Sequence, residues 1–403
     1  MARKLRVAVI GGGLGGVCAA SALLHHGHEV HVYEAAPQLL EVGGGLTLGP
    51  NAMKALRSIG LEALVRSIGW SAEHQLTHNW KSGRVTARRS SREAADRYGA
   101  SNCTVHRGEL LNAFASVLDP RLVSVGERCE SASTAADDVA VARFANGREI
   151  EADVVVGADG IRSTVRTSLF GEDSPRFTGK IVYRTDPIPV DAVPGGAPSP
   201  DSHLWLGPHG AVVVFRVSAG AKINFHAHHD DETYTNESWV TECDREEVLA
   251  VHKDWHESLL RLFSASKTWY KWALYDRDPI PQWSKGRVTL LGDAAHPMLP
   301  YLGQGVCQAI EDGCVLSAAL AAMPGDVPAA LQLYEQIRRP RASRIVLAAR
   351  AQGTYNHLSS PFAIWRRDLT MTFRRLRRRT NQRDWIASYD AGAPDVLERA
   401  TAA

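Results

Sequence analysis

The N-terminal part of the chain alternates short runs of β-branched and aliphatic residues with glycine-rich turns. RVAVI (residues 6–10) predicts a strand, GGGLGG predicts a tight turn, and VCAASALLHH predicts a buried helix that ends at Gly27. EVHVYEA then predicts a second strand. Two parallel strands joined by one helix form a βαβ unit of about 30 residues, so we expect the chain to begin with an α/β fold.

Two later apolar runs end in a similar way. ADVVVGADG (152–160) and GRVTLLGDAA (286–295) end on an Asp beside a Gly, and such runs are typical of parallel strands covered on both faces. Between them, GAVVVFRV and KINFHAHHD predict antiparallel strands. After Gly303, apolar residues recur at helical spacing and predict a helix. The helical tail is expected to end or bend at Pro340.

These patterns predict an α/β protein with a Rossmann-like domain, an inserted sheet-based domain and a helical C-terminal tail. We expect the Rossmann-like domain to comprise residues 1–174 and 283–350, and the inserted domain residues 175–282. Residues 351–403 form the predicted helical C-terminal segment. A chain of 403 residues with 44% hydrophobic content is long and apolar enough for a large core.

Charge and cysteine content narrow the classes of function. Lys and Arg total 46 against 44 acidic residues, and this balance predicts no nucleic-acid partner. Six cysteines without a C-x-x-C pair favour free thiols in a reducing compartment. The first strand leaves no room for a secretory signal, and no apolar run approaches the ~18 residues that span a bilayer, so we expect a cytoplasmic protein without membrane contact. The charge run at 366–385 is interpreted as a solvated helix face.

The turn after the first strand predicts a dinucleotide site. Gly11, Gly13 and Gly16 fit the pattern G-x-G-x-x-G, in which backbone N–H groups and a helix N-terminus approach a pyrophosphate. Glu34 closes the second strand, where a carboxylate can bind the adenosine ribose. The other predicted contacts of this half are Leu14, Gly15 and Ala35. NAD and FAD would fit this turn equally well.

A second strand–turn–helix near residue 300 favours FAD. Asp293 ends a strand at the edge where ligands bind in open α/β sheets, and it can accept hydrogen bonds from ribitol hydroxyls. Gly303 and Gly305 open a helix, with Val306 in its first turn, and the positive N-terminal end suits an anionic reduced flavin. FAD is long enough for both turns, so we expect the first to hold its ADP half and the second its redox half.

Four segments together resemble the fingerprints of the FAD-dependent aromatic hydroxylases, the single-component flavoprotein monooxygenases. They are VIGGGLGG, HRGELL, GADGIRSTVR and LLGDAAHPMLPYLGQGVCQAIED. Within this family the chain is similar to the salicylate 1-monooxygenases, 6-hydroxynicotinate 3-monooxygenases and 3-hydroxybenzoate 6-hydroxylases. The resemblance implies that Arg107 and Asp159 contact the flavin. From the residues alone, Arg107 leads a helix and Asp159 is a helix N-cap.

The resemblance also implies a reaction and its partners. FAD stays bound, NADH or NADPH docks transiently, and oxygen adds to the reduced flavin to form a hydroperoxide. That species hydroxylates a small phenolic acid or a hydroxylated heteroaromatic, salicylate-like or 6-hydroxynicotinate-like, in a site that excludes water. A homodimer is left open. A flavin-dependent reductase or dehydrogenase and a non-catalytic FAD-binding sensor are the alternatives.

The substrate side of the chain departs from the 6-hydroxynicotinate- and 3-hydroxybenzoate-type members of the family it resembles, which carry a His and a Tyr where this chain has Ala211 and Phe215. The Phe favours a salicylate-like substrate. Because alternate strand residues share a face, His209 would lie on the same side as Ala211, and we hypothesise that His209 acts as the base. Thr47 is a candidate for orienting a substrate oxygen, and Pro297 for lining the reactive edge of the flavin.

Three further residues have a less specific interpretation. Arg184 could hold a substrate carboxylate, but a surface salt bridge is the favoured interpretation. His226 and His228 alternate with apolar residues along a predicted strand, and no third ligand is spaced to join them. No metal site is therefore predicted.

Overall fold

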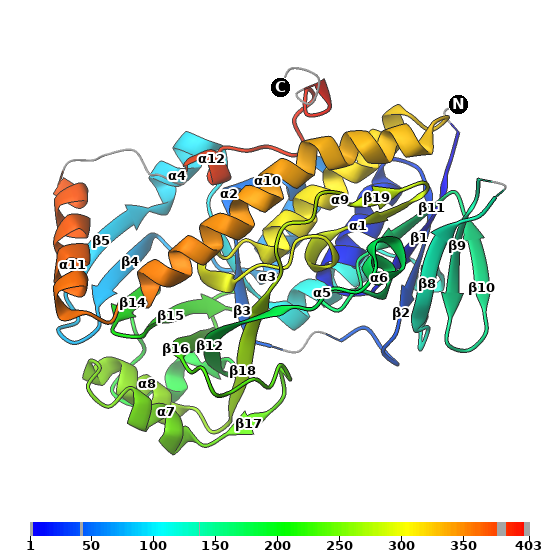
Figure 1. Cartoon of the computed structure of the whole chain (residues 1–403). Coiled ribbons are helices and arrows are strands. Elements are labelled where there is room, and N and C mark those ends of the chain that lie inside the picture. Colours follow the sequence, from blue (N-terminus) through cyan, green and yellow to red (C-terminus); the bar gives the residue numbers. More distant parts are fainter. Residues whose placement is uncertain (1–2, 41–42, 137, 377–383, 399–403) are drawn as a thin grey trace.

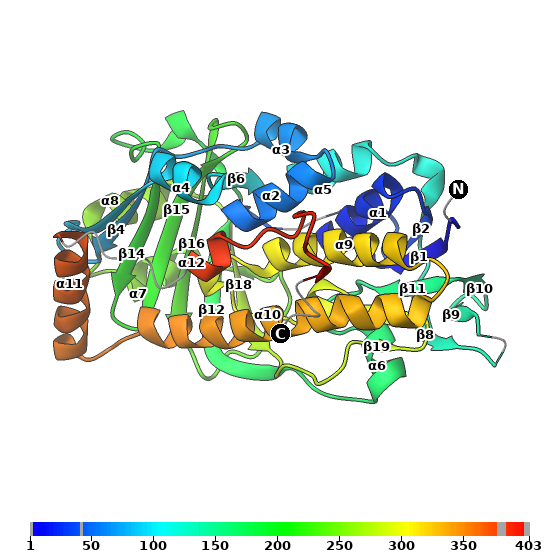
Figure 2. The same cartoon turned by 90° about the horizontal axis from the view of Figure 1, so that it is seen from above.

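The computed structural model describes residues 3–40, 43–136, 138–376 and 384–398. A mixed sheet packed with helices forms one half of the molecule, and a large, mostly antiparallel sheet forms the other (Figure 1). The long helix α10 (Val327–Asn356) runs across both halves beside α9 (Gly305–Ala322), as Figure 2 shows. The α/β fold with an additional sheet is confirmed.

The nucleotide-type sheet is built as the sequence predicts. Its strands are β1 (Arg6–Ile10), β2 (Glu29–Glu34), β7 (Val123–Val125), β11 (Val154–Gly157), β19 (Ser284–Lys285) and β20 (Val288–Leu290). They lie in the order β19–β20–β11–β1–β2–β7, and the pairs from β20 to β7 are parallel. The two later apolar runs are therefore neighbours of the first strand, as parallel strands buried on both faces should be.

Small residues let two helices cross closely over this sheet. Helix α1 (Leu14–His25) follows β1 and packs against α9. A Cβ atom at Gly313 would lie 3.0 Å from Cα of Ala19, and one at Gly15 would lie 3.1 Å from Cβ of Ala309. Glycine at these two positions is therefore what permits the close crossing.

The second sheet is larger than the predicted insertion. Its strands are β4 (His74–Asn79), β5 (Val85–Ser90), β12 (Arg176–Thr185), β13 (Ile188–Pro189), β14 (Ser202–Gly207), β15 (Gly210–Val217), β16 (Lys222–Asp230), β17 (Glu242–Cys243) and β18 (Trp269–Asp276). The order is β17–β18–β12–β16–β15–β14–β4–β5, with β13 beside β16. Because β4 pairs in parallel with β14, residues 74–90 belong to a sheet that was expected only within 175–282.

The two faces of this sheet have different neighbours. On one face, Tyr183, Val212 and Phe225 form a core with the helices α7 (Arg245–Val251) and α8 (Glu257–Ala265). The opposite face meets β3 (Gly45–Leu48), since a Cβ at Gly45 would touch Phe215 and Val217. That face looks toward the nucleotide half.

Shorter elements complete the fold. They are α2 (Pro50–Ser58), α3 (Glu62–Ile68), α4 (Ser91–Tyr98), β6 (Cys103–His106), α5 (Arg107–Ser116), β8 (Cys129–Thr134), β9 (Ala140–Phe144), β10 (Glu149–Ala152), α6 (Thr164–Phe170), α11 (Pro361–Leu376) and α12 (Asp384–Ala387). Strand β3 pairs with β6, and β8, β9 and β10 form a small antiparallel sheet. Cys18, Cys103, Cys129, Cys243, Cys307 and Cys314 are free thiols.

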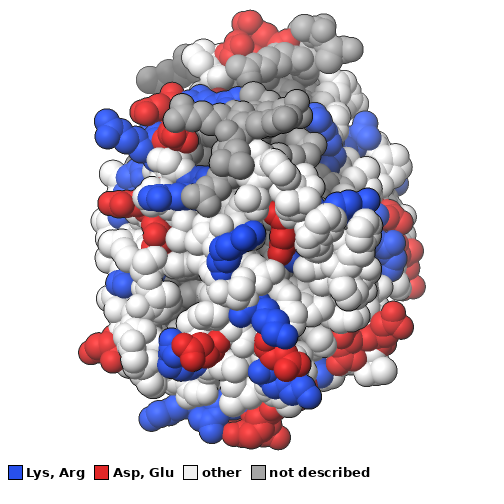
Figure 3. Space-filling model, turned by 90° about the vertical axis from the view of Figure 1, so that its left-hand side faces the viewer, with Lys and Arg blue, Asp and Glu red and all other residues white. Residues whose placement is uncertain are grey.

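The C-terminal helices differ from expectation in two respects. Helix α10 continues through Pro340, so of the predicted end or bend at this residue the end is wrong. In helix α11, Arg367 is buried and donates to the carbonyl of Leu206, whereas Phe362 (66%), Trp365 (58%) and Arg366 are exposed. The described part of the charge run at 366–385 therefore exposes a charged residue beside apolar ones, and residues 377–383 lie outside the described residues. Figure 3 shows charges of both signs interspersed over this end of the molecule.

Helix α9 has a strongly apolar composition. Its length and hydropathy would allow it to cross a membrane, but 72% of the relevant window is buried inside the protein. It is a core helix, packed between α1 and α10.

Candidate active site

Three turns meet at one edge of the nucleotide-type sheet. The strands β20, β11 and β1 are parallel neighbours, and their carboxyl ends lead into Asp293, Asp159 and Gly11. This is the edge where open α/β sheets bind ligands. The structure therefore brings the two distant glycine turns together, as the sequence predicts.

The first turn needs glycine because neighbouring backbone atoms of the protein lie very close to it. Gly11 has φ +109°, and a Cβ there would lie 2.4 Å from the carbonyl oxygen of Ala158. A Cβ at Gly16 would lie 2.0 Å from the carbonyl oxygen of Gly11. Glu34 accepts hydrogen bonds from the N–H groups of Gly12 (2.6 Å) and Ala36 (2.7 Å). The carboxylate thus stands at the turn, and the residues present fit a dinucleotide.

Two predicted flavin contacts have clear local roles. Asp159 accepts hydrogen bonds from Ser163 Oγ and from the N–H groups of Thr164 (2.8 Å) and Val165 (3.1 Å). Its carboxylate caps α6, which is the role that the residues alone suggested, and burial raises its pKa. Arg107 begins α5, and its Cδ would lie 3.1 Å from a Cβ at Gly43. Arg107 therefore stands beside the glycine loop before β3.

The second turn rests on a buried ionic network. Gly303 adopts a left-handed conformation just before α9, which begins at Gly305. Asp312, in α9, accepts hydrogen bonds from the Gly292 N–H (3.1 Å) and from His296 Nε2 (2.6 Å). Burial alone would raise the pKa of Asp312, but His296 and Arg338 together lower it to about 2. The ionised carboxylate thus fixes the turn that carries Asp293.

The loop at residues 43–47 joins the second turn to the large sheet. The Gly45 N–H donates to Asn224 Oδ1 at 2.6 Å, and a Cβ at Gly44 would lie 2.1 Å from the same oxygen. At the other end of the loop, a Cβ at Gly303 would come within 3.9 Å of Thr47 Cβ. Thr47 therefore lies beside the second turn, where the sequence placed it.

Asn224→Ala should loosen this loop. The substitution leaves the half-buried Gly45 N–H without its partner, at a cost of about 1–3 kcal/mol. We expect the Kd for FAD to rise about tenfold, measured by titrating the apoprotein and following flavin fluorescence. Asn146→Ala, which removes an exposed hydrogen bond to Glu127, is the matched control and should leave the Kd unchanged. Equal affinities of the two variants would contradict the role of Asn224.

His209 lies outside the strand in which it was expected. It lies in the turn before β15, with φ +57°, and its side chain is 54% exposed and paired with Asp230 at 3.3 Å. Strand β15 begins only at Gly210, so the alternation of a strand does not extend back to residue 209. The strand alternation that placed His209 therefore does not apply, and its role as the base stays a prediction.

The other residues predicted on the substrate side are Phe215, Pro297 and Arg184. Phe215 lies on the face toward β3, directly opposite Asn224. Pro297 is buried, whereas Pro300 in the same segment is exposed, so Pro300 has the more accessible ring. Arg184 is only 3% exposed, and its guanidinium lies over the Tyr270 ring at 4.3 Å. The expected salt bridge of Arg184 is present, with the exposed Asp186 at 3.7 Å, but the arginine itself is buried and not a surface residue.

Sequence reasoning missed that His226 and His228 belong to this face. They pair directly with Val213 and Ala211 of β15, which share the side of Phe215. The signal was present in the sequence, because the short turn between β15 and β16 fixes the register of the hairpin. Among the described residues, no group of His, Cys, Asp and Glu could hold a metal ion.

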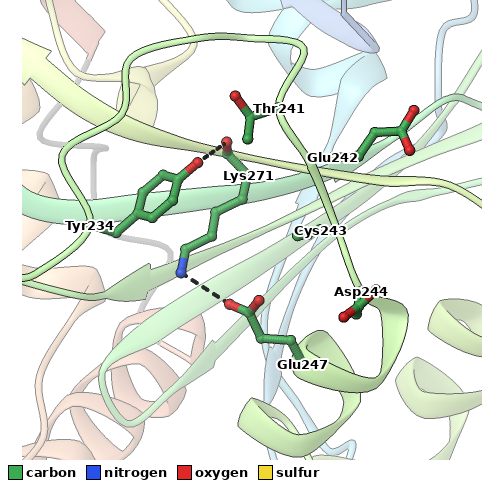
Figure 4. Close-up of a pocket in the computed structure, with 7 residues that line it drawn as sticks. All are labelled: Tyr234, Thr241, Glu242, Cys243, Asp244, Glu247 and Lys271. Atoms are coloured by element: carbon green, nitrogen blue, oxygen red, sulfur yellow. Dashed lines mark hydrogen bonds and ion pairs between the residues drawn. The ribbon is translucent and has the colours of Figure 1, made fainter.

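A polar pocket of ≈ 470 Å³ lies elsewhere, beside α7 (Figure 4). Lys271 and Glu247 line it and are joined by an ion pair at 3.0 Å. Lys271 lies directly opposite Tyr183, which belongs to the core under α7 and α8. This pocket is therefore on the face of the sheet that points away from the glycine turns.

Comparison with known proteins agrees with this geometry. The model of a family described as FAD binding domain matches residues 4–349. The chain belongs to this family, and it is an FAD-dependent aromatic monooxygenase.

Three similar proteins indicate where the chain stands within the family. It is 38% identical over 354 residues to a 3-amino-4-hydroxybenzoate 2-monooxygenase from Streptomyces platensis, with 88% of this chain and 89% of the relative covered. It is 36% identical over 350 residues to the 6-hydroxynicotinate 3-monooxygenase of Bordetella bronchiseptica, covering 86% and 90%. A salicylate hydroxylase substrate complex superimposes with a TM-score of 0.81 at 26% identity, covering 98% of both chains.

Proposed function

We propose that this enzyme hydroxylates a small aromatic acid that carries a ring hydroxyl, with 3-amino-4-hydroxybenzoate as the first candidate. The observation that carries the proposal is that both glycine turns lie at one edge of the nucleotide-type sheet, and that the loop at residues 43–47 lies between the second turn and the sheet face of Phe215 and Asn224. The similar proteins named above act on a hydroxybenzoate and a hydroxynicotinate, which supports the substrate class.

The chain's own residues would bind and enclose the cofactor. FAD, when bound, supplies the electron transfer and oxygen activation that no side chain provides. The turn at Gly11 to Gly16, with Glu34, would hold the ADP half, and Asp293 with the N-terminus of α9 would hold the redox half. Phe215 and the loop at Thr47 would keep water from the ring that is hydroxylated.

We further propose that NADH or NADPH docks only transiently. The sequence has one G-x-G-x-x-G turn, and the FAD fit described above uses it. Which of the two nucleotides serves is a direct outcome of the assay below.

Oxygen-coupled turnover tests the function. FAD-loaded enzyme is mixed with NADH or NADPH, with and without each member of a panel of hydroxybenzoates and hydroxynicotinates. We expect one of them to accelerate nucleotide oxidation at least about tenfold, a change of ~1.4 kcal/mol in activation free energy. Oxygen should be consumed, and the product mass should show one added oxygen atom. Turnover without oxygen uptake would instead support a reductase, and no acceleration by any aromatic compound would support a sensor.

A further inference from the structure

His226 is a half-buried histidine on the face of the large sheet that meets the loop at residues 43–47. It lies directly opposite Val213 of β15 and Arg184 of β12. Its ring is 6.2 Å from that of Phe215, and the two rings are edge to face. A ligand between the sheet and the loop at Thr47 would therefore meet His226.

The neighbours of His226 fix which ring nitrogen carries the hydrogen. Because Asn224 Oδ1 accepts from the Gly45 N–H at 2.6 Å, its amide NH₂ group is the part that faces His226. Asn224 Nδ2 lies 3.5 Å from His226 Nδ1, so Nδ1 is the acceptor of this long contact. Burial lowers the pKa of His226 to about 4, so the ring is neutral at pH 7. A neutral ring that accepts at Nδ1 donates from Nε2.

Among the described residues, no group accepts a hydrogen bond from the Nε2–H of His226. The tautomer thus presents a hydrogen-bond donor, not a base, to whatever binds beside it. A half-buried N–H donor is stabilised when a ligand offers it a hydrogen-bond acceptor, and most strongly when that acceptor is ionised.

The charges around His226 favour an anion. Arg184, directly opposite, is a buried cation that pairs with the exposed Asp186 at 3.7 Å. At the far end of the same face, Asp230 is paired with Lys180 at 2.7 Å and with His357 at 2.6 Å. His228, next to His226 on this face, has a pKa well below its usual value because of burial, so it adds no charge at pH 7.

We propose that His226 donates a hydrogen bond from Nε2 to an ionised oxygen of the aromatic substrate and so selects the substrate in its anionic form. The inference rests on the proposed function and names the group that recognises the substrate. Where that oxygen is a phenol, its O–H bond breaks on binding, the electron pair stays on oxygen and the proton passes to solvent. His226 keeps its own hydrogen throughout.

The test measures ligand binding to FAD-loaded protein by the change in flavin absorbance. The probe is 3-amino-4-hydroxybenzoate. We expect His226→Leu to raise its Kd about ten- to a hundredfold, the usual effect of losing a hydrogen bond to a charged group. His226→Gln, whose amide can still donate, should stay within about threefold of the wild type. The matched control is His229→Leu, a half-buried histidine of the same strand that points to the opposite face, and it should leave the Kd unchanged.

Two truncated probes identify the oxygen that is bound. If Nε2–H binds the carboxylate, His226→Leu weakens 3-aminobenzoate; if it binds the phenolate, the variant weakens 2-aminophenol, and the phenol pKa of the bound probe is lowered in the wild type only. Either result supports the proposal. Should His226→Leu fail to fold, His226→Met removes the donor with a more adaptable side chain.

The two failures are distinguishable. If His226→Leu and His226→Met bind all three probes as the wild type does, while the wild type still couples oxygen uptake to an aromatic substrate, the role of His226 is overturned and the function stands. If the wild type binds no phenolic acid and shows no coupled turnover, both are overturned.

Discussion

Gly16→Ala is expected to give a protein that no longer retains FAD. The added Cβ would stand 2.0 Å from the backbone carbonyl oxygen of Gly11, and a backbone atom cannot swing aside as a side chain can. Relieving the overlap must displace the turn or helix α1, at a cost of about 1–3 kcal/mol of folding stability. We expect the Kd for FAD to rise about a hundredfold, equivalent to ~2.7 kcal/mol.

The measurement is the flavin absorbance that remains after dialysis, together with thermal unfolding of the apoprotein. Gly325→Ala is the matched control, because no heavy atom lies within 4 Å of its added Cβ and its φ is not positive. This control should keep both its colour and its stability. Wild-type FAD content in Gly16→Ala would show that the first turn does not bind the cofactor.

Arg338→Leu is expected to destabilise the fold by about 3–5 kcal/mol. Arg338 is 0% exposed, donates to Asp312 Oδ1 at 2.8 Å and to Gln308 Oε1 at 2.7 Å, and forms a close ion pair with Glu311. Removing the guanidinium would leave two carboxylates buried with less compensation. Because Asp312 holds the Gly292 N–H and His296, we also expect weaker FAD binding.

The folding stability lost in Arg338→Leu should become smaller as the pH falls. In the wild type the pKa values of Asp312 and Glu311 are lowered, so their contribution to stability is present above the unfolded pKa values; the part from Asp312 is lost as the pH falls toward about 2. In Arg338→Leu the folded pKa values rise and the carboxylates can protonate, so the difference from wild type should be smaller at pH 5 than at pH 8. Urea unfolding at the two pH values measures it.

The neighbouring Arg339 supplies the control for the same helix. It is 37% exposed at its side chain and pairs with Glu335 at 3.5 Å. Arg339→Leu should change the free energy of unfolding by less than about 1 kcal/mol at either pH. If both arginine variants lose the same stability, the buried network is not what holds α9 to α10.

Local patterns predicted the strands of this fold well but not their partners. β1, β15 and β16 begin and end where their apolar runs do. The entry of β4 and β5 into the large sheet has no such signal, because the parallel pairing of β4 with β14 joins segments more than a hundred residues apart. No sequence pattern within β4 or β5 indicates the pairing of β4 with β14.

The candidate site shows the same division. Gly11 and Gly16 could be identified because their backbone conformation and close contacts demand glycine. The predicted place of His209 in the strand was wrong because His209 is a turn residue with positive φ, where the alternation of a strand does not hold. The position of His226 followed from the register of one hairpin, in which Val217 faces Lys222 and Val213 therefore faces His226. Counting back from that turn would have found it.

The small residues where α1 crosses α9 set the distance between the helices that follow the two glycine turns. Gly313 lies against Ala19, and Gly15 against Ala309, so one extra methyl group at this seam would push the two helices apart. We therefore expect cofactor affinity to depend on Gly313 and Ala19, which are not among the predicted cofactor contacts, as well as on Gly15, which is. Engineering for tighter or altered flavin retention has in this seam a set of core positions as influential as the loops themselves.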